Sequence, residues 1–249
     1  MSDDPLLERL AELVTDAPPE LIDRIAARWV TVEGPVGEMF VAYTDQGIAY
    51  VRPAGADAPR EFRRRFGRPL LRAARPPAGL VPALRTGRAT GLRFDLRELS
   101  GFQAEVLRAA QTIPRGEVRP YAWIARRINR PRAVRAVGTA LATNPVPLLI
   151  PCHRVTRSDG SLGEYIFGTE TKRRLLRAEN ANLDEAHDLA RKGVFYVGSD
   201  TTGVVCYPTC HHARHITPPH RKGFRTIAQA ETAGYRPCRH CQPAAVEPA

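Results

Sequence analysis

Lysine is almost missing from this chain: only three of its 37 basic residues are lysines, and methionine and tryptophan occur twice each. No stretch approaches the roughly 20 consecutive apolar residues that a membrane-spanning helix needs. The opening MSDDPLLERL lacks the basic start and apolar run of a secretory signal. These absences predict a soluble cytoplasmic protein with no membrane partner. Cysteine is also scarce, and in a reducing compartment five cysteines are expected to serve metal binding or chemistry.

The formal net charge of +11 is unevenly distributed along the chain. Residues 1–100 hold 15 basic and 14 acidic side chains, residues 101–180 hold 14 and 6, and residues 181–249 hold 8 and 6. The preference for arginine could reflect a GC-rich genome, but such a bias would spread the excess evenly. Its concentration in 101–180 favours a nucleic-acid surface there over a merely solvated basic face.

The first hundred residues change from a helical to a strand period. Residues 5–28 predict two short helices, interrupted at Pro18-Pro19. The run GEMFVAYTDQGIAYVRP, residues 37–53, predicts a β-hairpin around Asp45-Gln46-Gly47. Residues 75–91 are rich in proline, glycine and arginine and predict a long loop. We interpret residues 1–97 as a small α/β domain.

Three helices are predicted between residues 100 and 142. Ser100 is a suitable N-cap for the first, Pro120 suits the first turn of the second, and Pro131 can open the third. In the third helix, Val134, Val137 and Leu141 should point inward, leaving Arg132, Arg135, Ala136, Thr139 and Ala140 elsewhere on its surface. The last two helices, joined by a tight turn, resemble a helix-turn-helix, although many helical pairs share this pattern.

The stretch LLIPCHRV, residues 148–155, places Cys152 beside His153 at the end of an apolar run. Nearby prolines exclude a helix, so an extended segment buried on both sides is expected. Cys152 is then either an inert core thiol with a raised pKa or a nucleophile served by a neighbouring base.

Residues 100–179 resemble the O6-alkylguanine-DNA alkyltransferase family, including its active-site signature PCHRV at 151–155. The resemblance implies irreversible, single-turnover transfer of an alkyl group, such as methyl, from O6 of guanine in double-stranded DNA to Cys152. It implies that His153 takes the thiol proton through a water, that Glu179 orients His153, and that Tyr121 protonates the departing guanine. Asn144 matches an asparagine that orders the turn near the cysteine.

The same resemblance assigns the DNA surface and the substrate pocket. Arg135 would fill the gap left by a flipped base, with Arg132, Ala136 and Thr139 beside it on DNA; Gly138 could serve helix packing instead. The pocket residues would be Pro151, Val155, Tyr165, Ile166 and Phe167. Ile166 and Phe167 are bulky where the family has small residues, which leaves the range of alkyl groups open.

The other four cysteines, Cys206, Cys210, Cys238 and Cys241, form two close pairs. Three residues separate the first pair, 27 separate the pairs, and two separate the second pair, a spacing that suits one structural zinc with four thiolates. Two disulfides are the alternative, which a reducing compartment disfavours. We interpret 181–192 as a linker and 193–243 as a zinc module whose metal supplies folding energy.

This C-terminal region resembles the zinc module of Ada-type methylation-repair proteins, here placed after the alkyltransferase region. The resemblance implies that Cys206 accepts a methyl group from a DNA phosphotriester. The expected whole is an α+β, monomeric, nucleoid-associated repair protein with residues 98–180 as the catalytic DNA-binding domain. The alternatives are a DNA-binding damage sensor or methylation-responsive regulator without transfer at Cys152, and a Cys/His hydrolase.

Overall fold

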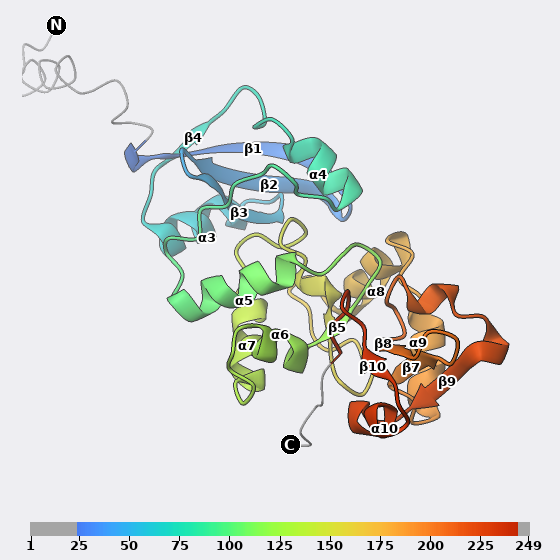
Figure 1. The fold of residues 1–249 in the computed structure, drawn as a ribbon. Helices are drawn as coiled ribbons and strands as arrows, with labels where there is room; N and C mark the ends of the chain where they lie inside the picture. The colour runs from blue at the N-terminus through green and yellow to red at the C-terminus, as the bar shows by residue number, and fades with distance from the viewer. Residues whose placement is uncertain (1–23, 244–249) are drawn as a thin grey trace, which may run out of the picture.

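The structure is a computed structural model that describes residues 24–243. An N-terminal sheet, a helical middle part and a small C-terminal sheet follow one another along the chain (Figure 1). The fold is therefore of the expected α+β class. The helices predicted over residues 5–28 lie almost wholly outside the described residues. None of the described helices combines the length and apolar character that a membrane span requires.

The predicted hairpin is confirmed as β2 (Gly37–Thr44) and β3 (Gly47–Pro53). With β1 (Ala27–Gly34) and β4 (Leu70–Arg72) it forms a four-stranded sheet in the order β3-β2-β1-β4. Only β4 pairs in parallel, with β1. Alternate side chains of each strand point to opposite faces, so the sheet buries apolar residues on both.

The two faces of this sheet are covered by helices α3 (Asp57–Phe66) and α4 (Leu80–Thr86). Phe62 of α3 joins Phe40 and Tyr50 in one apolar cluster, whereas α4 packs into the main core on the other face. The prediction of a long loop over residues 75–91 is therefore wrong for residues 80–86, which form α4. Burial of α4 against the sheet stabilises a helix too short to form alone.

The helical middle part begins with α5 (Gly101–Gln111), and Ser100 is its N-cap as predicted, within a capping box completed by Gln103. Helices α6 (Tyr121–Arg127) and α7 (Val134–Ala142) form the expected helix-turn-helix pair. Their starts differ from prediction: Pro120 is the N-cap of α6, and Pro131 lies in the turn before α7.

The buried face of α7 also differs from prediction. Val137 and Leu141 are buried as expected, but Val134 is 36% exposed because it is the first residue of the helix. Ala140, predicted on the surface, is buried on the side of α7 that packs against α5 and α6.

The segment before Cys152 is buried as predicted but is not a strand. Leu148 has a φ of 74°, and Pro147 and Ile150 form an isolated bridge across a turn. Cys152–Arg154 then make one 3-10 turn, η1, before β6 (Val155–Thr156) pairs in parallel with β5 (Arg119–Pro120). The prolines exclude an α-helix but permit this turn, which the apolar pattern alone does not indicate. Helix α8 (Thr169–Ala178) follows.

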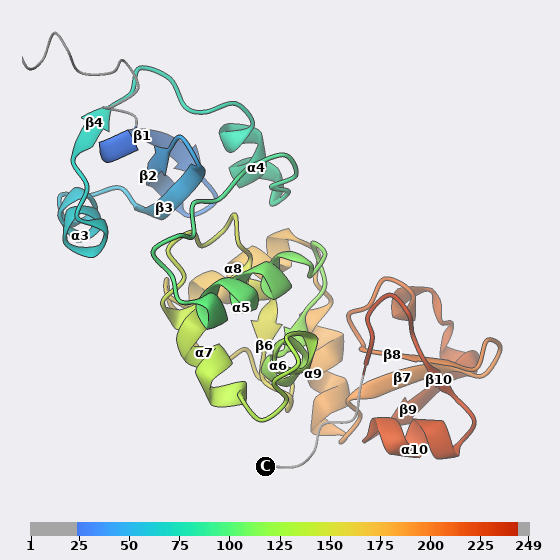
Figure 2. The same cartoon turned by 60° about the vertical axis from the view of Figure 1, so that its left-hand side comes forward.

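The C-terminal part contains a second four-stranded sheet in the order β10-β8-β7-β9. Its elements are β7 (Tyr196–Ser199), β8 (Val204–Cys206), η2 (Ala213–His215), η3 (Pro218–His220), β9 (Arg221–Phe224), α10 (Ile227–Thr232) and β10 (Arg236–Pro237). Helix α9 (Leu183–Arg191) occupies the segment that we interpreted as a linker, and it lies beside this sheet in Figures 1 and 2.

Candidate functional site

Cys152 is the first residue of η1 and is only 5% exposed. Asn144 donates from Nδ2 to the Cys152 sulfur at 3.2 Å and to the Ile150 carbonyl at 3.0 Å, while its Oδ1 accepts from the Val146 amide. Asn144 therefore holds the turn that presents the sulfur. Burial raises the pKa of the Cys152 thiol, and the hydrogen bond from Asn144 opposes this only in part. The thiol is protonated at neutral pH and needs a base.

His153 can supply that base. Its Nε2 lies 3.0 Å from Oε1 of Glu179, and its Nδ1 is buried without a hydrogen bond to any described residue. Burial lowers the pKa of His153, although Glu179 opposes the shift, so the ring is neutral. Because the carboxylate accepts a hydrogen bond from Nε2–H, the lone pair of the neutral ring is on Nδ1.

Glu179 caps the C-terminus of α8 and is buried. Arg154 donates to both of its oxygens, at 2.9 Å from Nε and 2.8 Å from Nη2, and the Gly116 amide donates at 3.3 Å. Burial raises the pKa of Glu179, but the hydrogen bonds from His153 and Arg154 outweigh it and lower the pKa to about 2. The carboxylate therefore stays ionised beside His153.

Two buried cations of this region were not singled out from the sequence. Arg154 also donates to the Ile113 carbonyl, and Lys172 donates to the carbonyls of Val155 and Leu162, each at 2.5 Å. Lys172 thus ties the loop after Cys152 to α8. The position of Arg154 inside the PCHRV signature was the available signal; Lys172 had none beyond being one of three lysines.

Tyr121, the first residue of α6, lies against the same loop. A Cβ atom on Gly163 would come within 3.0 Å of the Tyr121 hydroxyl, and Gly163 has a φ of 68°. Burial, and next the charge of a Cys152 thiolate, raise the pKa of Tyr121. The phenol therefore stays protonated and can act as a donor near the sulfur.

The expected pocket residues divide into two groups. Pro151 and Val155 are buried on either side of η1, whereas Tyr165, Ile166 and Phe167 are half-buried. The Tyr165 ring meets His153 edge to face at 6.0 Å and Phe167 at 5.4 Å. A cavity of about 520 Å³ nearby is lined by Leu162, Gly163 and Glu164 but, among the described residues, not by Tyr165–Phe167.

Of the predicted DNA-contacting residues, all exposed, Arg135, Ala136 and Thr139 lie on the outer face of α7, whereas Arg132, predicted in the helix, lies in the turn before it. Within residues 24–243, the side chain of Arg135 makes no hydrogen bond or ion pair, and its backbone carbonyl accepts from the Thr139 hydroxyl at 3.3 Å. A Cβ atom on Gly138 would meet nothing within 4 Å, so close helix packing does not explain that glycine. The face is available to an extended partner.

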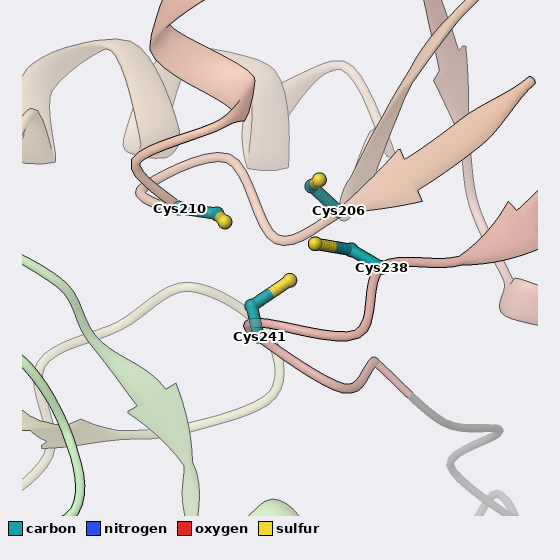
Figure 3. A group of neighbouring side chains, drawn as sticks. All are labelled: Cys206, Cys210, Cys238 and Cys241. Carbon is teal, nitrogen blue, oxygen red and sulfur yellow. The ribbon is translucent and has the colours of Figure 1, made fainter. Parts of the chain in front are cut away.

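Figure 3 shows the four remaining cysteines pointing toward one another from the end of β8, the turn after it, and the segment after β10. The sulfurs of Cys206, Cys210, Cys238 and Cys241 all lie within 4.8 Å of one another, and all four residues are buried without disulfides. Hydrogen bonding with Cys210 and Cys241 raises the pKa of Cys206. Thiols packed this closely cannot all ionise unless a cation joins them, so the set fits one thiophilic metal ion.

Two family models match adjacent parts of the chain. Residues 101–181 match "6-O-methylguanine DNA methyltransferase, DNA binding domain", and residues 182–244 match "Metal binding domain of Ada". The fold and site together define a protein that holds a buried Cys-His pair beside a helix-turn-helix and carries a cluster of four cysteines suited to a metal ion.

The chain belongs to the methylated-DNA–protein-cysteine methyltransferase family. It is 33% identical to the methylated-DNA–protein-cysteine methyltransferase of Methanosarcina acetivorans over 60% of this chain and 96% of that protein. It is 36% identical to the Escherichia coli "Bifunctional transcriptional activator/DNA repair enzyme Ada" over 64% of this chain and 47% of Ada. The crystal structure of Mycobacterium tuberculosis OGT in complex with DNA matches with a TM-score of 0.53 and 32% identity, covering 61% of this chain and 92% of that one.

The chain spans about half the length of several of the curated relatives that it matches, from 47% of Ada to 59% of the Methanosarcina barkeri methyltransferase.

Proposed function

We propose that this protein repairs DNA by moving an alkyl group, such as methyl, irreversibly from O6 of guanine to Cys152. The observation that carries the proposal is the buried Cys152–His153–Glu179 set, whose sulfur is bonded by Asn144, two residues after the end of α7. The similarity to a relative crystallised in complex with DNA supports double-stranded DNA as the partner. The protein acts as a monomer, with residues 98–180 as the catalytic unit.

The transfer needs one proton removed and one supplied. Cys152 gives its proton to Nδ1 of His153 through a water, and the thiolate attacks the alkyl carbon. The bond from that carbon to O6 breaks with its electron pair left on guanine, and Tyr121 protonates the departing base. The proton held by His153 balances the one that Tyr121 gives. The thioether formed has no route back, so each molecule reacts once.

The reacting carbon of duplex DNA must leave the base stack before Cys152 can reach it. Extrusion of a base costs a few kcal/mol. Arg135 lies on the exposed face of α7 and fills the space that the base leaves, while Ala136 and Thr139 are small enough for the helix to approach the groove closely. Arg132 adds attraction to the phosphates.

A second acceptor is Cys206. We infer that Cys206, Cys210, Cys238 and Cys241 hold one zinc ion within the module of residues 193–243, which keeps four thiolates ionised together. Cys206 lines a hollow of about 470 Å³ whose other walls carry Arg236, Arg239, His212, His215 and His240. A cationic hollow suits a DNA phosphate. The Cys206 thiolate attacks the methyl carbon of a phosphotriester, and the methyl–oxygen bond breaks to leave a phosphodiester anion.

Mapping of methylated cysteines by mass spectrometry tests both acceptors. Duplex DNA with O6-methylguanine should methylate Cys152, and DNA with methylphosphotriesters should methylate Cys206. Cys152→Ser should abolish only the first product. Tight DNA binding with no methyl on Cys152 would favour the damage-sensor alternative, and an unmodified Cys206 would leave it a metal ligand only.

A further inference from the structure

The turn formed by residues 115–119 lies between the Cys152 site and the metal module. Toward the Cys152 site, the Gly116 amide donates to Oε2 of Glu179 at 3.3 Å. Arg115 donates to the Ala178 carbonyl, one residue before Glu179, at 2.6 Å. The turn therefore holds both the carboxylate and the end of helix α8 that carries it.

The other side of the same turn is held by the metal module. Arg214 of η2 donates to the Gly116 carbonyl. The Thr209 hydroxyl accepts from the Val118 amide at 3.1 Å and donates to the Val118 carbonyl at 3.3 Å. Gly116 is thus bonded through its amide to Glu179 and through its carbonyl to Arg214.

The packing at Gly116 leaves no room for a side chain. Its φ is 79°, and a Cβ atom there would lie 2.7 Å from the Glu179 carbonyl oxygen and 3.3 Å from Nη2 of Arg214. Gly116 is therefore packed between Glu179 of the helical part and Arg214 of the metal module. A displacement on the module side must therefore move the Glu179 side.

The next residue, Glu117, contacts both parts of the protein. Glu117 and Arg119 pair with each other, and both are nearly inaccessible to solvent. Oε1 of Glu117 also accepts from the His211 amide at 3.1 Å and lies 2.8 Å from Nε2 of His240. Trp123 completes the contact by donating to the Cys241 carbonyl at 3.0 Å. One continuous apolar cluster crosses this boundary and includes both Cys152 and the four clustered cysteines.

We propose that the metal module is a structural part of the Cys152 site, and that Arg214 is a positioning residue acting through Gly116 on Glu179. The inference rests on the proposed function at Cys152. Without the Arg214 donor the turn is free to move away from α8, and Glu179 loses the Gly116 amide. The Glu179 carboxylate then orients His153 less firmly. Misplacement of a general base by a fraction of an ångström slows the proton transfer that it performs.

The test compares Arg214→Met, which keeps the length of the side chain without its donors, with Arg214→Lys, which restores a donor. Arg225→Met is the matched control, because Arg225 is an exposed arginine of the same module and, among the described residues, only its backbone makes a hydrogen bond. The substrate is the free base O6-benzylguanine, so DNA binding does not enter. Iodoacetamide labelling of Cys152, zinc content and melting temperature are measured in parallel.

Arg214→Met should lower the rate of transfer to Cys152 about tenfold or more with full zinc content. Arg214→Lys should recover most of that loss, and Arg225→Met should match the wild type. An unchanged transfer rate in Arg214→Met overturns the inference. A lower rate also overturns it if zinc content or melting temperature falls at the same time and Arg214→Lys does not restore the rate. If the wild type takes nothing from O6-benzylguanine and nothing from duplex DNA that contains O6-methylguanine, the function proposed at Cys152 fails, while the iodoacetamide rates still report on Arg214.

Discussion

At the scale of single residues, burial acts differently on each member of the Cys152 set. It raises the pKa of the Cys152 thiol and lowers that of the His153 imidazole, so both are neutral, whereas Arg154 and His153 keep Glu179 ionised despite burial. The chain therefore stores an unreactive thiol beside an unprotonated base.

The rate of alkyl transfer should depend on pH through His153. Its pKa is lowered below the usual value of about 6.5, so the ring stays neutral and able to accept a proton at pH 6.5. Glu179 stays ionised throughout this range because its pKa is about 2. The rate with O6-benzylguanine should be level from about pH 8 down through 6.5 and fall only at lower pH. A half-maximal rate at or above pH 6.5 would contradict this assignment.

At the scale of elements, α7 and the loop after η1 carry the residues that we propose contact DNA and the alkyl group. Sequence periodicity identified α7 but placed its start too early and its buried face incorrectly, because neighbouring helices decide which residues are covered. The sequence predicted Tyr165, Ile166 and Phe167 of the loop as pocket residues, with Ile166 and Phe167 departing from the family pattern. The structure places its Tyr165 against His153 and Phe167 against Tyr165.

Arg135→Ala tests the role of α7. Only a base stacked in duplex DNA has to be extruded, whereas a free base does not need Arg135. The loss of Arg135 should therefore slow transfer from duplex DNA at least about tenfold and leave transfer from free O6-benzylguanine nearly unchanged. Arg108→Ala, an exposed arginine of α5, serves as the control for net charge. Equal losses with both substrates would refute base extrusion by Arg135. Single-turnover rates on the two substrates provide the measurement.

Phe167→Ala tests the loop as a determinant of alkyl size. Removing a ring that packs edge to face on Tyr165 opens space behind it. The ratio of transfer rates for O6-benzylguanine and O6-methylguanine should rise by about tenfold, the scale of selectivity that apolar pocket contacts provide. Phe102→Ala, at a half-buried position on α5, controls for general destabilisation. If the ratio does not change, the side chain of Phe167 does not limit the alkyl group.

At the scale of the whole molecule, the metal module is packed onto the helical part instead of being tethered to it. The segment interpreted as a linker is largely helix α9, and the boundary carries a buried ion pair between Glu117 and Arg119. The buried apolar residues of the module belong to the same cluster as those of the helical part. Its stability must therefore come from the metal and from the docked surface together.

Removal of zinc should unfold residues 193–243 selectively. Structural zinc supplies roughly 10 kcal/mol to small modules of this kind, more than their cores can replace. After chelation, backbone amide signals of β7 to β10 should lose dispersion in an NMR spectrum, while those of the N-terminal sheet β1 to β4 persist. Cys238→Ser should reproduce the effect without chelator. A spectrum that is unchanged by complete removal of the metal would contradict a structural role for zinc.

The sequence by itself determined what is local or chemical: the hairpin turn, the Ser100 cap, the paired cysteines and the signature around Cys152. Local patterns suffice there because a turn, a cap or a ligand pair depends on backbone preferences over a few residues. Only the tertiary structure decided that α4 forms, that Val134 is exposed, and that Gly116 lies between Glu179 and Arg214. Those outcomes depend on burial between segments far apart in the chain, which no local pattern records.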